Sequence, residues 1–231
     1  NGIDDDGNGY IDDINGWDFR GGTNNPGDTH GHGTFCAGII AANANNGLGI
    51  AGINQRSSIM ALRVMSPDQS SDLDYAMAMT RYLADAIVYA ADNNVKVVNN
   101  SWGLPFPSKL VTDAIDYAHQ KGTVMVFASG NSAADSHFFY PQAHWSVLTV
   151  NASTPADEIA VFSNYGVASD VIAPGGGGLG DSESDDPRDG VRGVVSTLAA
   201  GSYMETSFPQ LVLEEYPRYQ RQAGTSFAAP H

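Results

Sequence analysis

An alternation of short apolar runs with longer runs of helical periodicity constrains the fold of this chain most. The expected elements, in chain order, are strand Ser58–Val64, helix Leu73–Asn93, strand Val95–Asn100, helix Ser108–Lys121, strand Thr123–Ala128 and strand Val147–Ala152. Several of the strand segments are almost unbroken apolar runs, which is typical of a parallel sheet covered on both faces. The sequence therefore predicts an α/β fold with a three-layer, doubly wound, mostly parallel sheet and helices on both faces.

Composition narrows the class of function. The 231 residues are enough for one sizeable core, so we expect one domain. No apolar run reaches the roughly 18 residues that a membrane span needs, so no transmembrane helix is expected. A net charge of −15 argues against nucleic-acid binding and suits calcium binding or a saline, extracellular setting. The single cysteine, Cys36, excludes an internal disulfide framework.

The first fifteen residues form an acidic loop with the spacing of a calcium-binding loop. The candidate ligands alternate along the chain and are Asp4, Asp6, Asn8, Tyr10 (through its carbonyl) and Asp12. Asn15 stands where an EF-hand places its bidentate Glu, and no helical pattern precedes the loop. We therefore expect a structural Ca²⁺ site without the EF-hand helices. A solvated acidic turn is the alternative.

A serine near the C-terminal end of the chain has the local setting of a nucleophile. In the segment Gly224–His231, a turn of small residues leads into a helix that would begin near Ser226. The first turn of a helix presents free backbone N–H groups and the positive end of the dipole, which suits an attack that creates an oxyanion. The alternative is a serine that only caps the helix.

A histidine enters another expected helix between two glycines. His32 begins a run of small and apolar residues that continues to Ala42. Alone, His32 would be a structural histidine, or a metal ligand together with His30. Together with Ser226 far downstream, a Ser–His pair is the sharper interpretation.

Polar turns follow two of the expected strands. Ser101–Gly103 comes after Val95–Asn100, and Ser129–Asn131 comes after Thr123–Ala128. Chemistry collects at the carboxyl ends of parallel strands, and the amide of Asn131 is suited to stabilising an oxyanion. Ordinary turns are the alternative for each segment.

Three of these segments together resemble the His, Asn and Ser signatures of the subtilisin-like serine proteases. They are His32–Gly38, Ala128–Asn131 and Gly224–His231, and they occur in the family's order. Shorter matches lie at residues 46–52, 140–141, 162–166 and 173–175, so the similarity covers essentially the whole chain. The resemblance implies a subtilisin-like fold, a secreted or cell-surface serine endopeptidase, polypeptide substrates and a pro-segment outside this chain.

The resemblance also implies roles for single residues. His32 is similar to the general base and Ser226 to the nucleophile. Asn131 is similar to the donor of the oxyanion hole, with the Ser226 N–H as the second donor. Ser101, Trp102 and Gly103 resemble the substrate-binding strand on one side of the family's first specificity pocket, and Ala128, Ser129 and Gly130 resemble the segment on its other side.

The chain departs from the family pattern at the catalytic aspartate. Asp18 and Asp28 precede His32, but neither follows an apolar strand that ends in Asp-Thr-Gly or Asp-Ser-Gly. We therefore expect the aspartate upstream of Asn1. We also expect residues 1–231 to be one catalytic domain truncated at both ends and inactive in isolation. Residues 175–192 and 207–221 have the character of inserts, the first a solvated loop or a second calcium site, and the second a rim of the cleft.

Two other functions compete with the peptidase. One is a subtilisin-like domain that keeps the fold only for binding, and the intact His32, Asn131 and Ser226 argue against it. The other is a lipase or esterase, a class that requires a Gly-x-Ser-x-Gly elbow, which this sequence lacks. Cys36, one helical turn after His32, is expected to be a buried packing residue.

Overall fold

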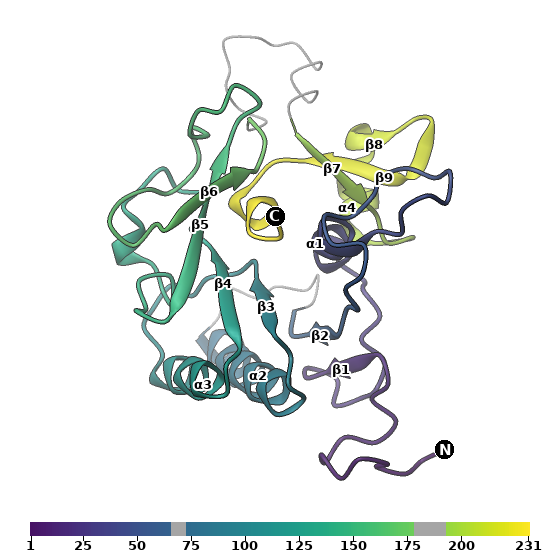
Figure 1. Ribbon diagram of the computed structural model, residues 1–231, viewed down its shortest axis with the longest axis vertical. Helices are drawn as coiled ribbons and strands as arrows, with labels where there is room; N and C mark the ends of the chain where they lie inside the picture. Colours follow the sequence, from purple (N-terminus) through teal and green to yellow (C-terminus); the bar gives the residue numbers. More distant parts are fainter. Residues whose placement is uncertain (66–72, 178–192) are drawn as a thin grey trace.

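The parallel strands form two separate sheets in the computed structural model, which describes residues 1–65, 73–177 and 193–231 (Figure 1). The first sheet pairs two strands, and the second has the order β3-β4-β5-β6, all parallel. The strands are β1 (Gly16–Asp18), β2 (Ala61–Arg63), β3 (Val97–Asn100), β4 (Val124–Ala128), β5 (Val147–Ser153) and β6 (Val171–Pro174). The predicted parallel sheet is thereby confirmed.

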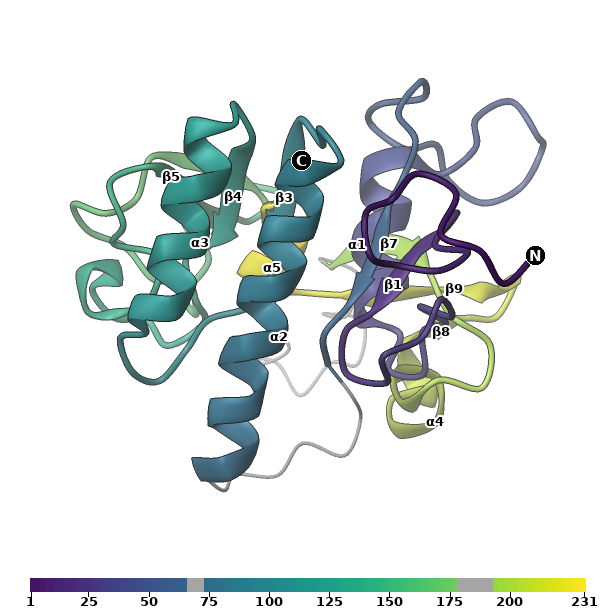
Figure 2. The same cartoon turned by 90° about the horizontal axis from the view of Figure 1, so that it is seen from below.

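Helices pack on both faces of the four-stranded sheet, as predicted, although α5 reaches only part of its face (Figures 1 and 2). The helices are α1 (His32–Ala41), α2 (Leu73–Asp92), α3 (Lys109–Gln120), α4 (Tyr203–Ser207) and α5 (Thr225–Ala228), with the 3-10 helices η1 (Ser136–Phe138) and η3 (Pro209–Leu211). Among the described residues, no helix is both long enough and apolar enough to cross a membrane.

One face packs against α2 and α3, and the other against α5. Met125 and Phe127 of β4 are fully buried against α2 and α3, together with Leu83, Ile87 and Ile115. Val126 and Ala128 point to the opposite face, because successive side chains of a strand alternate. There they form a cluster of small residues with α5. Large side chains therefore fill the core between the sheet and α2 and α3, and small side chains fill it between the sheet and α5.

The sequence explains α3 directly. Its buried side chains recur at helical spacing and are Val111, Ala114, Ile115 and Ala118. The Ser108 hydroxyl accepts the N–H of Val111 at 3.5 Å and caps the first turn. Gly122 follows the helix at a φ of 84°, a conformation that glycine adopts without strain.

A third sheet is antiparallel and has the order β7-β9-β8. Its strands are β7 (Val194–Thr197), β8 (Val212–Leu213) and β9 (Tyr216–Gln222). Residues 207–221, which we expected to be an insert at the rim, supply β8 and most of β9, the central strand of this sheet. Of the other expected insert, residues 178–192 lie outside the described part of the chain.

Two local expectations were wrong. No strand was expected before Ser58, but Gly16–Asp18 forms β1, which pairs in parallel with β2. The strand expected over Ser58–Val64 is only Ala61–Arg63, since β1 offers three partners. Neither result is visible in local periodicity, because pairing between distant segments decides both.

Candidate active site

The predicted His and Ser segments meet where α1 and α5 begin. His32 is the first residue of α1, and Ser226 is the second residue of α5. The two helices are in contact, with the ring centroids of Phe35 and Phe227 4.4 Å apart. The His32 ring lies 5.4 Å from that of Phe227, the residue after Ser226. The fold thus places the imidazole beside the first turn of the serine helix.

Strand β7 holds α1 in this position. The Ser196 hydroxyl donates to the carbonyl of Phe35 at 2.6 Å, and the Thr197 hydroxyl donates to the carbonyl of Thr34 at 2.8 Å. The approach is so close that a Cβ on Gly38 would lie 2.2 Å from the Thr197 oxygen. Only glycine fits at position 38, because any side chain would push the helix away from the strand.

Asn131 is tied to the residue that precedes Ser226. Its Oδ1 accepts the backbone N–H of Thr225 at 2.9 Å and the Thr225 hydroxyl at 2.8 Å. The same hydroxyl oxygen accepts the N–H of Gly130 at 3.1 Å. Since the amide oxygen is occupied, Nδ2 is the atom of this side chain that is suited to donating to a ligand beside Ser226.

Ser101 is also linked to Ser226. Its hydroxyl donates to the Ser226 carbonyl at 2.7 Å and accepts from Nδ2 of Asn99 at 3.0 Å. The Ser226 hydroxyl lies 3.4 Å from the carbonyl of Ser101. The Ser101–Gly103 segment therefore runs directly beside the serine, as its position after β3 predicts.

Cys36 lies next to the hydrogen bond between Ser101 and Ser226 and is buried, as expected. Its Sγ is 3.4 Å from the Ser226 carbonyl oxygen and 3.6 Å from the Ser101 hydroxyl. Burial raises the pKa of the Cys36 thiol to about 12. The thiol is therefore neutral, which suits packing and not nucleophilic attack.

The imidazole of His32 is held in its neutral form. Burial, together with the nearby His30, lowers the pKa of His32 to about 4, although Asp28 opposes the shift. At neutral pH the ring is unprotonated, which is the form that accepts a proton from a hydroxyl.

Asp28 is close to His32 in sequence but is engaged elsewhere. Its Oδ1 accepts the N–H groups of His30 and Gly31, and its Oδ2 accepts the N–H and hydroxyl of Thr34, all at 2.7–2.8 Å. Burial opposes ionisation, but these hydrogen bonds outweigh it and lower the pKa of Asp28. Asp28 therefore organises the turn into α1.

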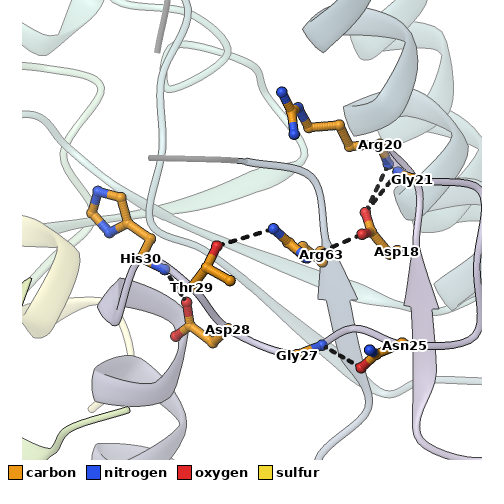
Figure 3. A network of polar contacts seen from close by, with 9 residues as sticks. All are labelled: Asp18, Arg20, Gly21, Asn25, Gly27, Asp28, Thr29, His30 and Arg63. Carbon is orange, nitrogen blue, oxygen red and sulfur yellow. Dashed lines mark hydrogen bonds and ion pairs between the residues drawn. The ribbon is translucent and has the colours of Figure 1, made fainter. Parts of the chain in front are cut away.

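Asp18 ends β1 but points to another network, shown in Figure 3. Its carboxylate pairs with Arg63 at 3.2 Å and accepts the N–H groups of Arg20 and Gly21. Arg63 also donates to the Thr29 hydroxyl at 3.0 Å, which connects β2 to the turn before α1. In residues 1–65, 73–177 and 193–231, no hydrogen bond joins a carboxylate to the His32 ring.

The predicted calcium ligands are spread along the N-terminal loop. Asp4 accepts the N–H groups of Gly7, Asn8 and Gly9, and Asp12 binds the amino group of Asn1 and the N–H of Gly2. The oxygen donors suit calcium, but within the described ranges no three His, Cys, Asp or Glu residues gather to hold a metal ion. Calcium binding by Asp4, Asp6, Asn8, Tyr10 and Asp12 stays a prediction.

Two residues that the sequence analysis missed organise the neighbouring segments. Nε2 of Gln142 donates to the carbonyls of Trp102 and Ala128 at 3.0 and 2.9 Å. Asn164, fully buried, donates to the carbonyl of Ser129 at 2.8 Å and accepts the N–H groups of residues 132 and 134. Gln142 follows the matched segment 140–141, and Asn164 lies within the matched segment 162–166. A polar residue in or next to a matched segment was therefore the sequence signal that could have identified both.

Comparison with known proteins agrees with this geometry. The family model described as the subtilase family (peptidase S8) matches residues 1–231. The chain is 35% identical over 218 residues to a thermophilic serine proteinase from Bacillus sp. (strain AK1), covering 94% of this chain and 44% of that protein. It is 38% identical over 162 residues to thermitase from Thermoactinomyces vulgaris, covering 70% and 55%.

A solved structure shares the fold. It is described as a cold adapted subtilisin-like serine proteinase, with a TM-score of 0.69 and 27% identity over 94% of this chain and 63% of that one. The chain spans about half the length of the curated relatives named above. The match of the family model over all residues and the shared fold lead to one conclusion: this chain belongs to the subtilase family of serine peptidases.

Proposed function

We propose that the protein containing this chain is a serine endopeptidase with Ser226 as nucleophile and His32 as general base. Asn131 Nδ2 and the Ser226 N–H would donate to the oxyanion. The observation that carries the proposal is the bonding of Asn131 Oδ1 to Thr225, which leaves Nδ2, without an acceptor among the described residues, as the donor next to the serine. The neutral imidazole beside the first turn of α5 is the complementary half of the site.

In this mechanism the Ser226 oxygen attacks the carbonyl carbon of the peptide bond, and its proton passes to His32. The tetrahedral oxyanion collapses, the C–N bond breaks, and the imidazolium gives its proton to the departing amine. Water, deprotonated by His32, then hydrolyses the acyl-enzyme and restores the serine hydroxyl. Donors aimed at the oxyanion act in the two tetrahedral states and contribute to kcat.

The carboxylate that orients His32 would come from outside the described residues. Asp18 and Asp28 are the two carboxylates closest before His32 in sequence, and both have their oxygens engaged with other partners. An added carboxylate beside the ring would raise the pKa of His32 from its present low value. From the family we further propose that the protein acts on polypeptides, is secreted and has a pro-segment.

The decisive experiment uses the full-length protein and its Ser226→Ala variant. We expect the wild type to hydrolyse casein and to be labelled by a fluorophosphonate, because such probes capture an activated serine. Ser226→Ala should lose both properties, whereas Ser58→Ala, at an exposed serine before β2, should keep both. Peptide hydrolysis that survives Ser226→Ala would refute the proposal, and a folded wild type without either property would favour the non-catalytic binding domain.

A further inference from the structure

One buried side chain joins the two segments that flank the serine. Gln142 is 3% exposed, and its Nε2 donates to the carbonyl of Trp102 on one side and to that of Ala128 on the other. Its own backbone carbonyl accepts the Thr149 hydroxyl at 2.8 Å, which anchors the residue to β5. The amide of Gln142 therefore lies between the segments 101–103 and 128–130 and bonds to both.

Two polar atoms at this place have no partner. In the described part of the chain, neither Oε1 of Gln142 nor the Ser129 hydroxyl makes a hydrogen bond, although both atoms are buried. Buried polar atoms are normally paired, because an unpaired one has lost water without compensation. A ligand that donates a hydrogen bond here would remove that penalty.

The free oxygen lies just below the surface. Gly103 is exposed, and a Cβ built on it would lie 3.6 Å from Oε1 and 3.1 Å from Nε2 of Gln142. With no side chain at position 103, the backbone of an exposed glycine covers this side of the amide.

We propose that Gln142 determines specificity by forming the floor between the two walls and offering Oε1 as an acceptor. The proposal rests on the proposed function. Substrates would be cleaved after a residue whose neutral side chain donates a hydrogen bond: an amide, as in Asn or Gln, or a hydroxyl, as in Ser. A large apolar side chain would meet the polar amide and leave Oε1 unpaired, which a hydrogen-bonding site rejects strongly.

The test compares peptides that differ only in the residue before the scissile bond: Gln, Asn, Ser, Leu or Phe. The full-length wild type is compared with Gln142→Ala, which removes the floor, and with Gln142→Met, which keeps the volume but not the acceptor. Gln220→Ala is the matched control. Gln220 is also fully buried, with Nε2 bonded to two carbonyls, those of Met204 and Phe208, and Oε1 without a partner, but it lies on β9.

We expect the wild type to prefer Gln and Asn over Phe in kcat/KM. Both Gln142 variants should reduce that preference by about ten- to a hundred-fold. Only Gln142→Ala should also gain activity on Phe, because only it opens space. Gln220→Ala should leave the preference unchanged. An unchanged preference in both folded Gln142 variants would overturn the inference.

A surface variant keeps the test independent of core stability. Gly103→Ala would place a methyl group 3.1 Å from Nε2 of Gln142, which crowds the amide without removing it. We expect it to reduce cleavage after Gln and Asn more than cleavage after Gly, and an equal effect on both would contradict the inference. Ser226→Ala separates the two proposals. Activity that survives in Ser226→Ala refutes the serine mechanism itself. If Ser226→Ala is inactive but the Gln142 variants keep the wild-type preference, only the role of Gln142 is refuted.

Discussion

The two faces of the four-stranded sheet are covered very differently. On the α2–α3 face, Met125 and Phe127 of β4 are fully buried. On the opposite face α5 covers only the carboxyl ends of the strands, at Ala128, Val150 and Ala152. Towards the amino ends, apolar side chains remain exposed on all four strands: Val97 at 57%, Val124 at 49%, Leu148 at 37% and Val171 at 45%.

This difference shows where stability and chemistry lie. The apolar run of β4 predicts that both faces of the strand are buried. Among the described residues, both faces are buried only at the carboxyl end of the strand. That end also carries Ser129, Gly130 and Asn131. The face sealed by α2 and α3 supplies the core, and the thinly covered face supplies the site, where small residues let α5 approach the strands closely.

The largest effect should come from the sealed face. Phe127→Ala should lower the free energy of unfolding by about 3–5 kcal/mol, because it empties a fully buried site. Val124→Ala, on the opposite face of the same strand, should cost about 1 kcal/mol or less, since half of that side chain is already exposed. Urea unfolding measures both, and equal losses would mean that the second face is as well covered as the first.

The carboxyl end of the sheet should respond in rate and not in stability. In the full-length protein, Asn131→Ala should lower kcat about a hundred- to a thousand-fold with KM little changed, because the donor acts on the transition state. Asn46→Ala, at an exposed asparagine in a turn, is the matched control. A loss that appears in KM alone would show that Asn131 binds the substrate instead.

Acid should weaken the site before the sealed core. In residues 1–231 alone, the unfolded chain takes up a proton at His32 near pH 6.5, whereas the folded chain does so only near pH 4. Stability should therefore fall by up to about 3 kcal/mol as the pH drops through this window. Asp28, whose pKa is lowered, should add a loss below pH 3.8. His32→Gln should flatten the first step in denaturation measured against pH, and Phe127→Ala should shift the curve without changing its shape.

Calcium would add a third region to the comparison. If the N-terminal loop binds the ion, excess chelator should lower the melting temperature, and the stabilisation should be about 2.7 kcal/mol at a hundred times the dissociation constant. Asp4→Asn with Asp6→Asn should abolish the response, whereas Asp113→Asn on α3 should keep it. A melting temperature indifferent to chelator would exclude a stabilising site.

The smallest effect should come from Cys36, beneath the serine. Cys36→Ala should cost about 1 kcal/mol and keep activity, since the neutral thiol only packs there. Wild-type enzyme should be inhibited by mercuric ion, which is small and soft, but not by iodoacetamide, and Cys36→Ala should lose the mercury sensitivity. Loss of activity in a folded Cys36→Ala variant would mean that the thiol takes part in catalysis.

Elements with strong local signals were predictable. Helices α2 and α3 and strands β3, β4 and β5 lie within a few residues of their expected bounds, because their apolar spacing is set by their own burial. Strands β1 and β9 were missed, since Gly-Trp-Asp and a charged, tyrosine-rich segment have no such spacing. They become strands only because β2 and β7 offer partners.

By itself, the sequence determined the fold class and the identity and order of the His, Asn and Ser segments, since these depend on residue type and periodicity along the chain. Only the tertiary structure decided which atoms are free to act. Asn131 and Thr225 lie 94 positions apart, and Gln142 lies 40 positions from Trp102, so their hydrogen bonds depend on strand register and helix packing. A side-chain amide has one oxygen and one nitrogen, and the partner that occupies one of them determines which is left for a substrate.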